Sequence, residues 1–148
     1  MSIRARAVSF ETTIEVRDTC LCLHVQRAAR ALARRFDDAL RPVGLTHGQF
    51  SMLNALNRPA PASMPQLVSL LGMDRTTLTA ALKVLERQGL VRITVNAADA
   101  RARDLVLSSK GHATLSRALP IWTRTHALVE AGLPTREPAR LRKTLTAL

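Results

Sequence analysis

The stretch DRTTLTAALKVLERQGL, residues 74–90, predicts one amphipathic helix with a defined start and stop. Asp74 is a good N-cap residue, and Gly89 is placed to end the helix. Apolar residues recur at intervals of three and four, which predicts one buried face. They are Leu78, Ala81, Leu82 and Leu85. The opposite face is rich in threonine and basic residues, and Glu86 is its only acid after the cap.

A second helix precedes this one and is joined to it by a short turn. Ser63 and Gln66 form a capping box at its start, and Gly72 is placed to end it in the left-handed conformation. A further helix, over residues 46–57, begins with a capping box of its own. Two helices joined by a turn of about three residues that contains glycine are typical of a helix-turn-helix.

A β-hairpin is predicted directly after the helix pair. Residues 91–95 (VRITV) and 104–108 (DLVLS) predict two strands, and the polar turn between them carries Arg101 and Arg103. Asp99, two residues before Arg101, is placed to hold it by an ion pair. A helix pair followed by a hairpin is a winged helix.

The basic face of residues 74–90 is explained by this arrangement, because the second helix of the motif enters the DNA major groove. Arginine can read guanine in a bidentate fork, and threonine can bond phosphate or touch a thymine methyl group. Arginine is also attracted into a narrow minor groove. A merely solvated face is the alternative, but such a face usually carries both signs of charge. The predicted DNA contacts are Arg75, Thr76, Thr77, Thr79, Lys83, Arg87, Arg101 and Arg103.

The composition agrees with a nucleic-acid partner. The net charge is +11, with 19 Arg against 3 Lys, and arginine is the side chain best suited to phosphate and guanine. An arginine-rich proteome would produce the same bias. The 148 residues, 47% of them hydrophobic, suffice for one domain, residues 1–148, with a buried core.

Several classes of protein are excluded by what the sequence lacks. No apolar run of 18 residues predicts a membrane span, and MSIRARAVSF has no signal-peptide core, so a cytoplasmic location is expected. The chain contains no glycine-rich phosphate loop, nucleophile motif or paired carboxylates, so we expect neither an enzyme nor a cofactor. Cys20 and His24 are too few ligands to predict a metal site.

Both ends of the chain predict further helices. Residues 13–41 have a long helical pattern, and a kink is expected at Pro120 in the helix that follows the hairpin. Leu141, Leu145 and Leu148 repeat an apolar pattern in a last short helix. Apolar stripes on terminal helices favour a dimer, although they are also compatible with an ordinary core.

The ordered set LRPVGLTHGQFSMLNAL (40–56), LLGMDRTTLTAALKVLERQGLV (70–91), DARAR (99–103) and LSSKG (107–111) resembles the MarR family of bacterial transcriptional regulators. The resemblance implies a mainly α fold with a small β-hairpin: a winged helix-turn-helix over 45–108, with its wing at about 91–108, and a helical dimerisation part over 12–42 and 109–148. It implies a homodimer that binds a near-palindromic operator in double-stranded DNA, usually as a repressor. It also implies that Arg101 is the wing-tip arginine.

Family members are often released from DNA by a small phenolic or other aromatic ligand, or by thiol oxidation. By its spacing, Cys22 matches the reactive cysteine of the OhrR branch of organic peroxide sensors, but Gln26 and Phe36 replace the tyrosines of that branch. The alternative interpretation is that Cys22 and Cys20 are small buried hydrophobic residues. The family's ligand pocket would be lined here by His24, His47, Phe50, Trp122 and His126, which alternatively pack a helix junction.

The sequence thus predicts a homodimeric, sequence-specific repressor that a small aromatic ligand releases. A redox-sensing repressor that acts through Cys22 and a non-specific DNA-binding protein remain as alternatives. A specific regulator prefers one near-palindrome, whereas a non-specific protein binds any duplex with a steep salt dependence.

Overall fold

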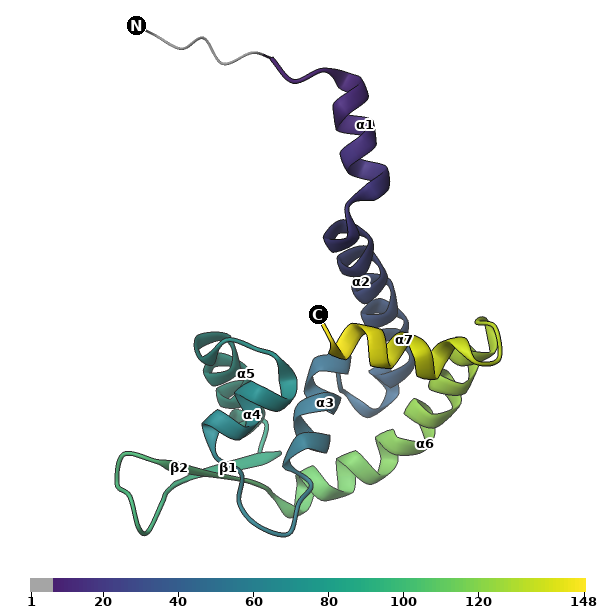
Figure 1. Ribbon diagram of the computed structural model, residues 1–148. Helices are drawn as coiled ribbons and strands as arrows, with labels where there is room; N and C mark the ends of the chain where they lie inside the picture. Colours follow the sequence, from purple (N-terminus) through teal and green to yellow (C-terminus); the bar gives the residue numbers. More distant parts are fainter. Residues whose placement is uncertain (1–6) are drawn as a thin grey trace, which may run out of the picture. The chain divides into compact units, whose positions relative to one another are not determined.

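The computed structural model describes residues 7–148 and confirms a mainly α fold with a small β-hairpin (Figure 1). The chain divides into two compact units, one ending at Arg35 and the other beginning at Phe36. The elements are α1 (Phe10–Thr19), α2 (Leu21–Leu40), the 3-10 turn η1 (Arg41–Val43), α3 (His47–Leu56), α4 (Met64–Leu71), α5 (Arg75–Arg87), β1 (Val91–Val95), β2 (Arg103–Leu107), α6 (Ser109–Ala131) and α7 (Glu137–Thr146).

The single helix expected over residues 13–41 is wrong, because the chain breaks at Cys20 into α1 and α2. Cys20 has an extended backbone (φ −68°, ψ 102°), and its sulfur accepts a hydrogen bond from the N–H of Leu23 at 3.4 Å. α1 is rich in threonine and β-branched residues, which are weak helix formers, and it buries no side chain. Neither propensity nor packing therefore carries the helix through Cys20.

The helix starts predicted from capping boxes are confirmed. The Thr46 hydroxyl accepts from the N–H of Gln49 at 3.2 Å, and the Gln49 side chain accepts from the N–H of Thr46 at 3.0 Å. Ser63 and Gln66 make the same reciprocal pair at the start of α4. Gly72 ends α4 with φ +62°, a conformation that glycine adopts without strain.

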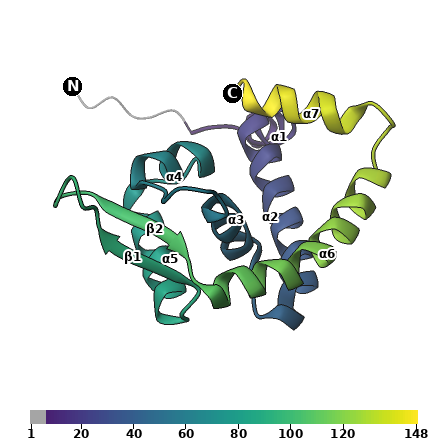
Figure 2. The same cartoon turned by 90° about the horizontal axis from the view of Figure 1, so that it is seen from below.

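The core of the second unit is built mainly from leucines of successive helices and the hairpin. Figure 2 shows α4 and α5 packed beside the hairpin, with α6 leading away from it. Fully buried side chains come from each of these layers: Leu40, Leu53, Leu67, Leu78, Leu82, Leu85, Val91 and Leu105. Burial of one face of each helix fixes which face points outward.

The hairpin pairs β1 with β2 antiparallel, with Val91 opposite Leu107 and Val95 opposite Arg103. A third segment joins it, because Ala62 exchanges two backbone hydrogen bonds of 2.9 Å with Leu105. The bridge attaches the start of α4 to the base of the wing.

α6 begins in close contact with the end of α5. A Cβ atom at Gly111 would lie 2.1 Å from the carbonyl oxygen of Leu90, so no other residue fits there without a shift of the backbone. Further along, α6 continues past Pro120 as one helix, and both views show it change direction near its middle, as expected for an internal proline (Figures 1 and 2). None of the helices within residues 7–148 has the length and apolar character needed to cross a membrane.

Candidate nucleic-acid interface

The first turn of α5 is organised by its N-cap. The Asp74 carboxylate accepts from the backbone N–H of Thr77 at 2.8 Å and from its hydroxyl at 2.6 Å. The Thr77 hydroxyl, followed by its backbone N–H, holds the pKa of the Asp74 carboxyl below its ordinary value. Asp74 is therefore an anion at neutral pH. Its charge compensates the positive end of the helix dipole of α5, and it does not pair with Arg75.

The side chains expected to contact DNA from α5 differ in how free they are. Arg75, Thr76, Lys83 and Arg87 are exposed, whereas Thr79 is half-buried. The Thr79 hydroxyl donates to the carbonyl of Arg75 at 2.7 Å, so both Thr77 and Thr79 donate within the helix. These two threonines can offer DNA only their oxygen lone pairs and methyl groups, which leaves Arg75 and Thr76 as the free donors of the first turn.

The turn of the wing, residues 96–102, is held by the side chain of Asn96. Its carbonyl oxygen accepts from the N–H groups of Ala98 and Asp99, both at 2.9 Å. Its amide nitrogen donates to Asp104 at 2.9 Å. Asn96 therefore ties the turn to β2, a role that the sequence analysis missed. Asparagine at the start of a polar turn is the signal that points to it.

The ion pair expected between Asp99 and Arg101 is wrong. Asp99 instead accepts from the backbone N–H of Arg101 at 2.9 Å, and no ion pair links the two side chains in the part of the chain that the structure describes. A carboxylate that accepts from the backbone N–H two residues later stabilises a local turn. This hydrogen bond is favoured over a salt bridge between two exposed side chains. The Arg101 guanidinium is left free for a partner.

Arg103 lies in β2 rather than in the turn. Its guanidinium donates to the carbonyl oxygens of Ala100 and Ala102, both at 3.0 Å. Arg103 thus closes the turn through these two hydrogen bonds, and both arginines are exposed. Arg101 and Arg103 therefore have different surroundings, although the sequence predicts the same role for both.

Arg75 of α5 and the two wing arginines line one cleft of about 240 Å³. The remaining walls come from the start of α4 and from the wing: Ser63, Met64, Pro65, Asp99 and Ala102. The first turn of α5 and the wing, which are separated by more than twenty residues in sequence, therefore present arginines on the same side of the unit. An anionic partner can reach both at once.

Comparison with known proteins assigns the family. Residues 43–102 match the model of the MarR family. The transcriptional regulator MosR of Mycobacterium tuberculosis, in its crystal structure with DNA, is 40% identical with a TM-score of 0.75, covering 86% of this chain and 97% of that chain. The chain belongs to the MarR family. The structural neighbours are winged-helix regulators of this family.

Two further relatives extend the comparison. The transcriptional repressor CouR of Rhodococcus jostii, bound to a DNA duplex, is 28% identical with a TM-score of 0.78, covering 96% of this chain and 98% of that chain. The regulator TtmR of Methylorubrum extorquens is 35% identical over 94 residues, which are 64% of this chain and 48% of TtmR. The chain spans about half the length of the curated relatives it matches.

Four of the five residues expected to line the family's ligand pocket lie together in the second unit. The rings of Trp122 and Phe50 are stacked at 5.9 Å, and those of Trp122 and His126 at 4.6 Å. Phe36 completes the group, 5.2 Å from His47. His24 belongs to the unit that ends at Arg35. None of these rings lines the arginine cleft.

The two cysteines lie at the break between α1 and α2, and both are free thiols. The expected burial of Cys22 is wrong: it is exposed, whereas Cys20 is half-buried. The Gln26 amide donates to the Cys22 sulfur at 3.3 Å. Within residues 7–148, no three His, Cys, Asp or Glu side chains are grouped so as to hold a metal ion.

Proposed function

We propose that this MarR-family chain is a sequence-specific DNA-binding regulator that acts as a homodimeric repressor. The observation that carries the proposal is the cleft that Arg75 of α5 and Arg101 of the wing line together. The net charge of +11 and the DNA complexes of MosR and CouR support it. In this proposal the chain is not an enzyme, and it works in the cytoplasm, where it has access to DNA.

The two arginines would serve different parts of the duplex. α5 enters the major groove, where Arg75 reads a guanine, and Arg101 follows the minor groove or its phosphates. Lys83 and Arg87 lie further along α5 and would contact phosphate, which adds affinity for any sequence. Thr76, Thr77 and Thr79 contribute oxygen and methyl contacts to the same groove.

A second copy of the chain is the proposed partner for the helical part, residues 12–42 and 109–148. Large apolar side chains are exposed on α6 and α7, with Leu128 64% exposed, and others on α1 and α2. Exposed apolar surface of this kind favours association. A dimer would place two copies of α5 about one helical turn of DNA apart, which matches a near-palindromic operator.

Selection from random duplexes by the purified protein at physiological salt tests the proposal. The expected result is a two-fold-symmetric motif with half-sites about 10 base pairs apart. Equal recovery of all sequences, with a steep dependence on salt, would instead establish the alternative of a non-specific DNA-binding protein.

Two substitutions in α5 sharpen this test. Arg75→Ala is expected to cost about 1–3 kcal/mol of operator binding and to relax one base position, because a bidentate contact is lost. Lys83→Ala should weaken all duplexes alike and reduce the salt slope by about 1. Binding curves on the selected motif and on a scrambled duplex measure both effects. Unchanged affinity and preference for Arg75→Ala would show that α5 does not read the operator.

A small aromatic effector is proposed to bind at the ring group of His47, Phe50, Trp122 and His126. The flat faces of these rings and the two imidazoles suit a phenolate or aromatic carboxylate. Trp122 is the only tryptophan, so its fluorescence reports binding directly. Titration with 4-hydroxybenzoate should quench it, and His126→Ala should weaken the titration. A titration unaffected by His126→Ala would place the ligand elsewhere.

Thiol sensing is the second candidate function, and one observation favours it. Cys20 has an extended backbone and precedes α2, so only Cys22 of the two cysteines is held in helical geometry. A hydroperoxide would oxidise the two thiols to a disulfide and be reduced to an alcohol and water. Treatment with tert-butyl hydroperoxide should lower operator affinity, reversibly with dithiothreitol, in the parent protein and not in Cys22→Ser. Equal loss in both proteins would refute this candidate.

A further inference from the structure

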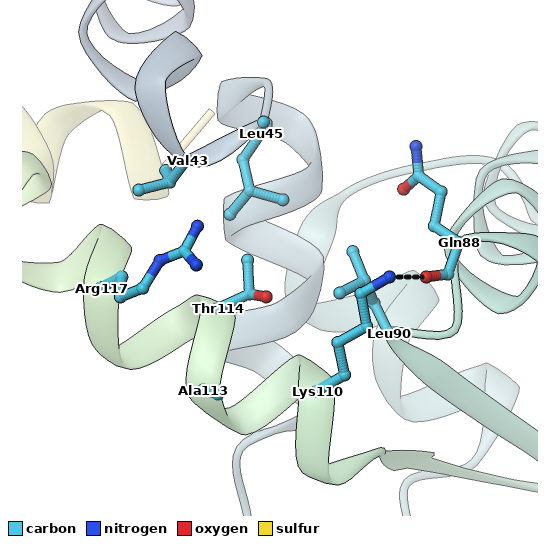
Figure 3. Close-up of a pocket in the computed structure, with 9 residues that line it drawn as sticks. Val43, Leu45, Gln88, Leu90, Lys110, Ala113, Thr114 and Arg117 are labelled. Carbon is cyan, nitrogen blue, oxygen red and sulfur yellow. Dashed lines mark hydrogen bonds between the residues drawn. The ribbon is translucent and has the colours of Figure 1, made fainter.

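The end of α5 is attached to the start of α6 through three consecutive backbone carbonyls. The Lys110 ammonium donates to the carbonyl of Gln88 at 2.8 Å, as Figure 3 shows. The Ser108 hydroxyl donates to the carbonyl of Gly89 at 2.6 Å, and the backbone N–H of Ser108 donates to that of Leu90 at 3.0 Å. We call these three hydrogen bonds the clasp.

Ordinary capping explains why these carbonyls need donors, but not why α6 supplies them. The last carbonyls of a helix have no partner within it, and water can satisfy them where the chain is exposed. Gln88 and Gly89 are both exposed. Their donors nevertheless come from side chains 22 and 19 residues further along the chain. The clasp therefore joins two elements that are each able to end in solvent.

Ser108 is the central residue of the clasp. Its hydroxyl donates to Gly89 and also accepts from the backbone N–H of Gly111 at 2.9 Å, as the N-cap of α6. The Lys110 ammonium lies at the carboxyl end of α5, where the helix dipole is negative and a cation is favoured. The clasp thus combines a shared hydroxyl, a charge-assisted hydrogen bond and the close approach of the two backbones at Gly111.

The clasp restricts the angle between α5 and α6 in a way that apolar packing does not. Both helices lie in the second unit, and buried leucines hold them to one core. The hydrophobic effect is non-directional, whereas hydrogen bonds weaken steeply when their angle changes. Three hydrogen bonds to consecutive carbonyls therefore leave little freedom for α5 to swing about its end.

A small swing at the clasp becomes a large displacement at the other end of α5. The helix has 13 residues and is therefore about 20 Å long, with Arg75 in its first turn. A rotation of about 10° at the clasp displaces that turn by about 3 Å, close to the rise of about 3.4 Å per base pair of DNA. The angle at the clasp thus decides against which base pair the first turn lies.

We propose that Ser108 and Lys110 are positioning residues that set the separation of the half-sites in the operator. The inference rests on the proposed function, in which α5 reads each half-site and α6 belongs to the dimerisation part. Neither side chain contacts DNA in this role. Base preference within a half-site then belongs to α5, whereas preference for one separation belongs to the clasp. The segment LSSKG, residues 107–111, supplies all three donors.

Operators that differ only in the number of base pairs between the half-sites measure this role. The set carries the selected half-sites with one or two base pairs inserted or removed. The parent protein is expected to prefer one separation about tenfold over its neighbours. Ser108→Asp and Lys110→Met should each reduce that ratio to about threefold or less, with the base preference within each half-site unchanged.

Matched variants separate positioning from stability and from charge. Ser108→Asp still caps α6 but has no hydrogen to donate to Gly89, whereas Ser108→Thr keeps the hydroxyl and should behave as the parent. Lys110→Arg keeps a charged donor and should retain the preference. Lys83→Met removes the same charge as Lys110→Met, at a proposed phosphate contact, and should weaken all separations alike.

An unchanged ratio in the folded variants would overturn the proposal. A uniform loss of affinity at every separation would do the same, because it marks a phosphate contact or lost stability rather than positioning. Absence of a preferred separation in the parent protein would also overturn it. Thermal unfolding establishes which variants are folded in the assay, and if Ser108→Asp is not, Lys110→Met decides alone.

The angle itself is measured without DNA, by the distance between spin labels at Thr76→Cys on α5 and Ser116→Cys on α6, two exposed positions. Cys20 and Cys22 are replaced by serine, and dilution with unlabelled protein restricts the distances to one chain. Lys110→Met should shift or broaden the distribution by about 3 Å, and an unchanged distribution would overturn the proposal. If the selection enriches no duplex, the proposed function fails, while this distance still decides whether the clasp sets the direction of α5.

Discussion

α5 and the turn of the wing present arginine to the same cleft but are held in shape by different forces. α5 is anchored by Leu78, Leu82 and Leu85, each fully buried. In the turn, residues 97–101 are all exposed, and the backbone is held by hydrogen bonds from side chains. One arginine therefore depends on the core of the unit, and the other on local polar contacts.

The difference determines what each region can tolerate. Loss of a buried leucine removes apolar burial and leaves a cavity, so it acts on the whole folding unit. Loss of a turn hydrogen bond changes stability by only about 1 kcal/mol and acts on the loop alone. Substitutions of the buried leucines of α5 should thus change folding, and substitutions in the turn should change binding.

Leu82→Ala should have the largest effect. We expect a loss of about 2–5 kcal/mol in the free energy of unfolding, because Leu82 is fully buried in α5. Urea denaturation followed by circular dichroism measures it. Thr76→Ala is the matched control on the exposed face of the same helix and should change stability by less than about 0.5 kcal/mol. Similar losses for both variants would show that burial does not anchor α5.

Asn96→Ala should have an intermediate effect, on DNA binding rather than folding. It removes the hydrogen bonds to Ala98, Asp99 and Asp104, so Arg101 is no longer pre-positioned. Operator affinity should fall by about threefold to tenfold, with the unfolding midpoint nearly unchanged. Fluorescence anisotropy on the selected duplex and thermal unfolding measure the two quantities.

A double-mutant cycle isolates the role of Asn96. In an Arg101→Ala background, Asn96→Ala should cost little further affinity, because the side chain that it positions is already absent. Additive losses would mean that Asn96 acts on DNA by another route. A large drop in thermal stability would mean that the turn belongs to the cooperative core.

The features that were predictable from sequence are those with a short, regular signal. Leu78, Leu82 and Leu85 follow the helical period, and the capping residues Thr46 and Ser63 lie at fixed distances from their glutamines. The winged helix fold follows from these local patterns in chain order. Each of them records a contact within one turn of helix or across one hairpin.

The features that were missed depend on contacts that periodicity does not describe. The pairing of Ala62 with Leu105 spans more than forty residues, and the need for glycine at 111 comes from the Leu90 carbonyl of another element. The prediction of an Asp99–Arg101 ion pair was wrong, because the backbone N–H of Arg101 competes for the same carboxylate. The break at Cys20 lies where no packing opposes it.

The N-cap of α5 depends on the same kind of polar contact that holds the turn of the wing. The Thr77 hydroxyl keeps the pKa of Asp74 below its ordinary value, so the ionised cap contributes stability above the unfolded-state pKa of about 3.9. That contribution is lost as the pH falls through the lower pKa of the folded state. Asp74→Asn keeps the cap and removes its charge, so the difference in stability between parent and variant should shrink below about pH 4.

Urea midpoints of parent and Asp74→Asn between about pH 2 and pH 7 measure this small effect. Repulsion among the many cations grows in acid, but it is common to both proteins and cancels in the difference. Thr77→Val removes the hydroxyl that donates to Asp74 and should reduce the pH dependence of the difference. A difference that stays constant with pH would mean that the Asp74 charge contributes nothing to α5, and that burial alone separates this helix from the wing.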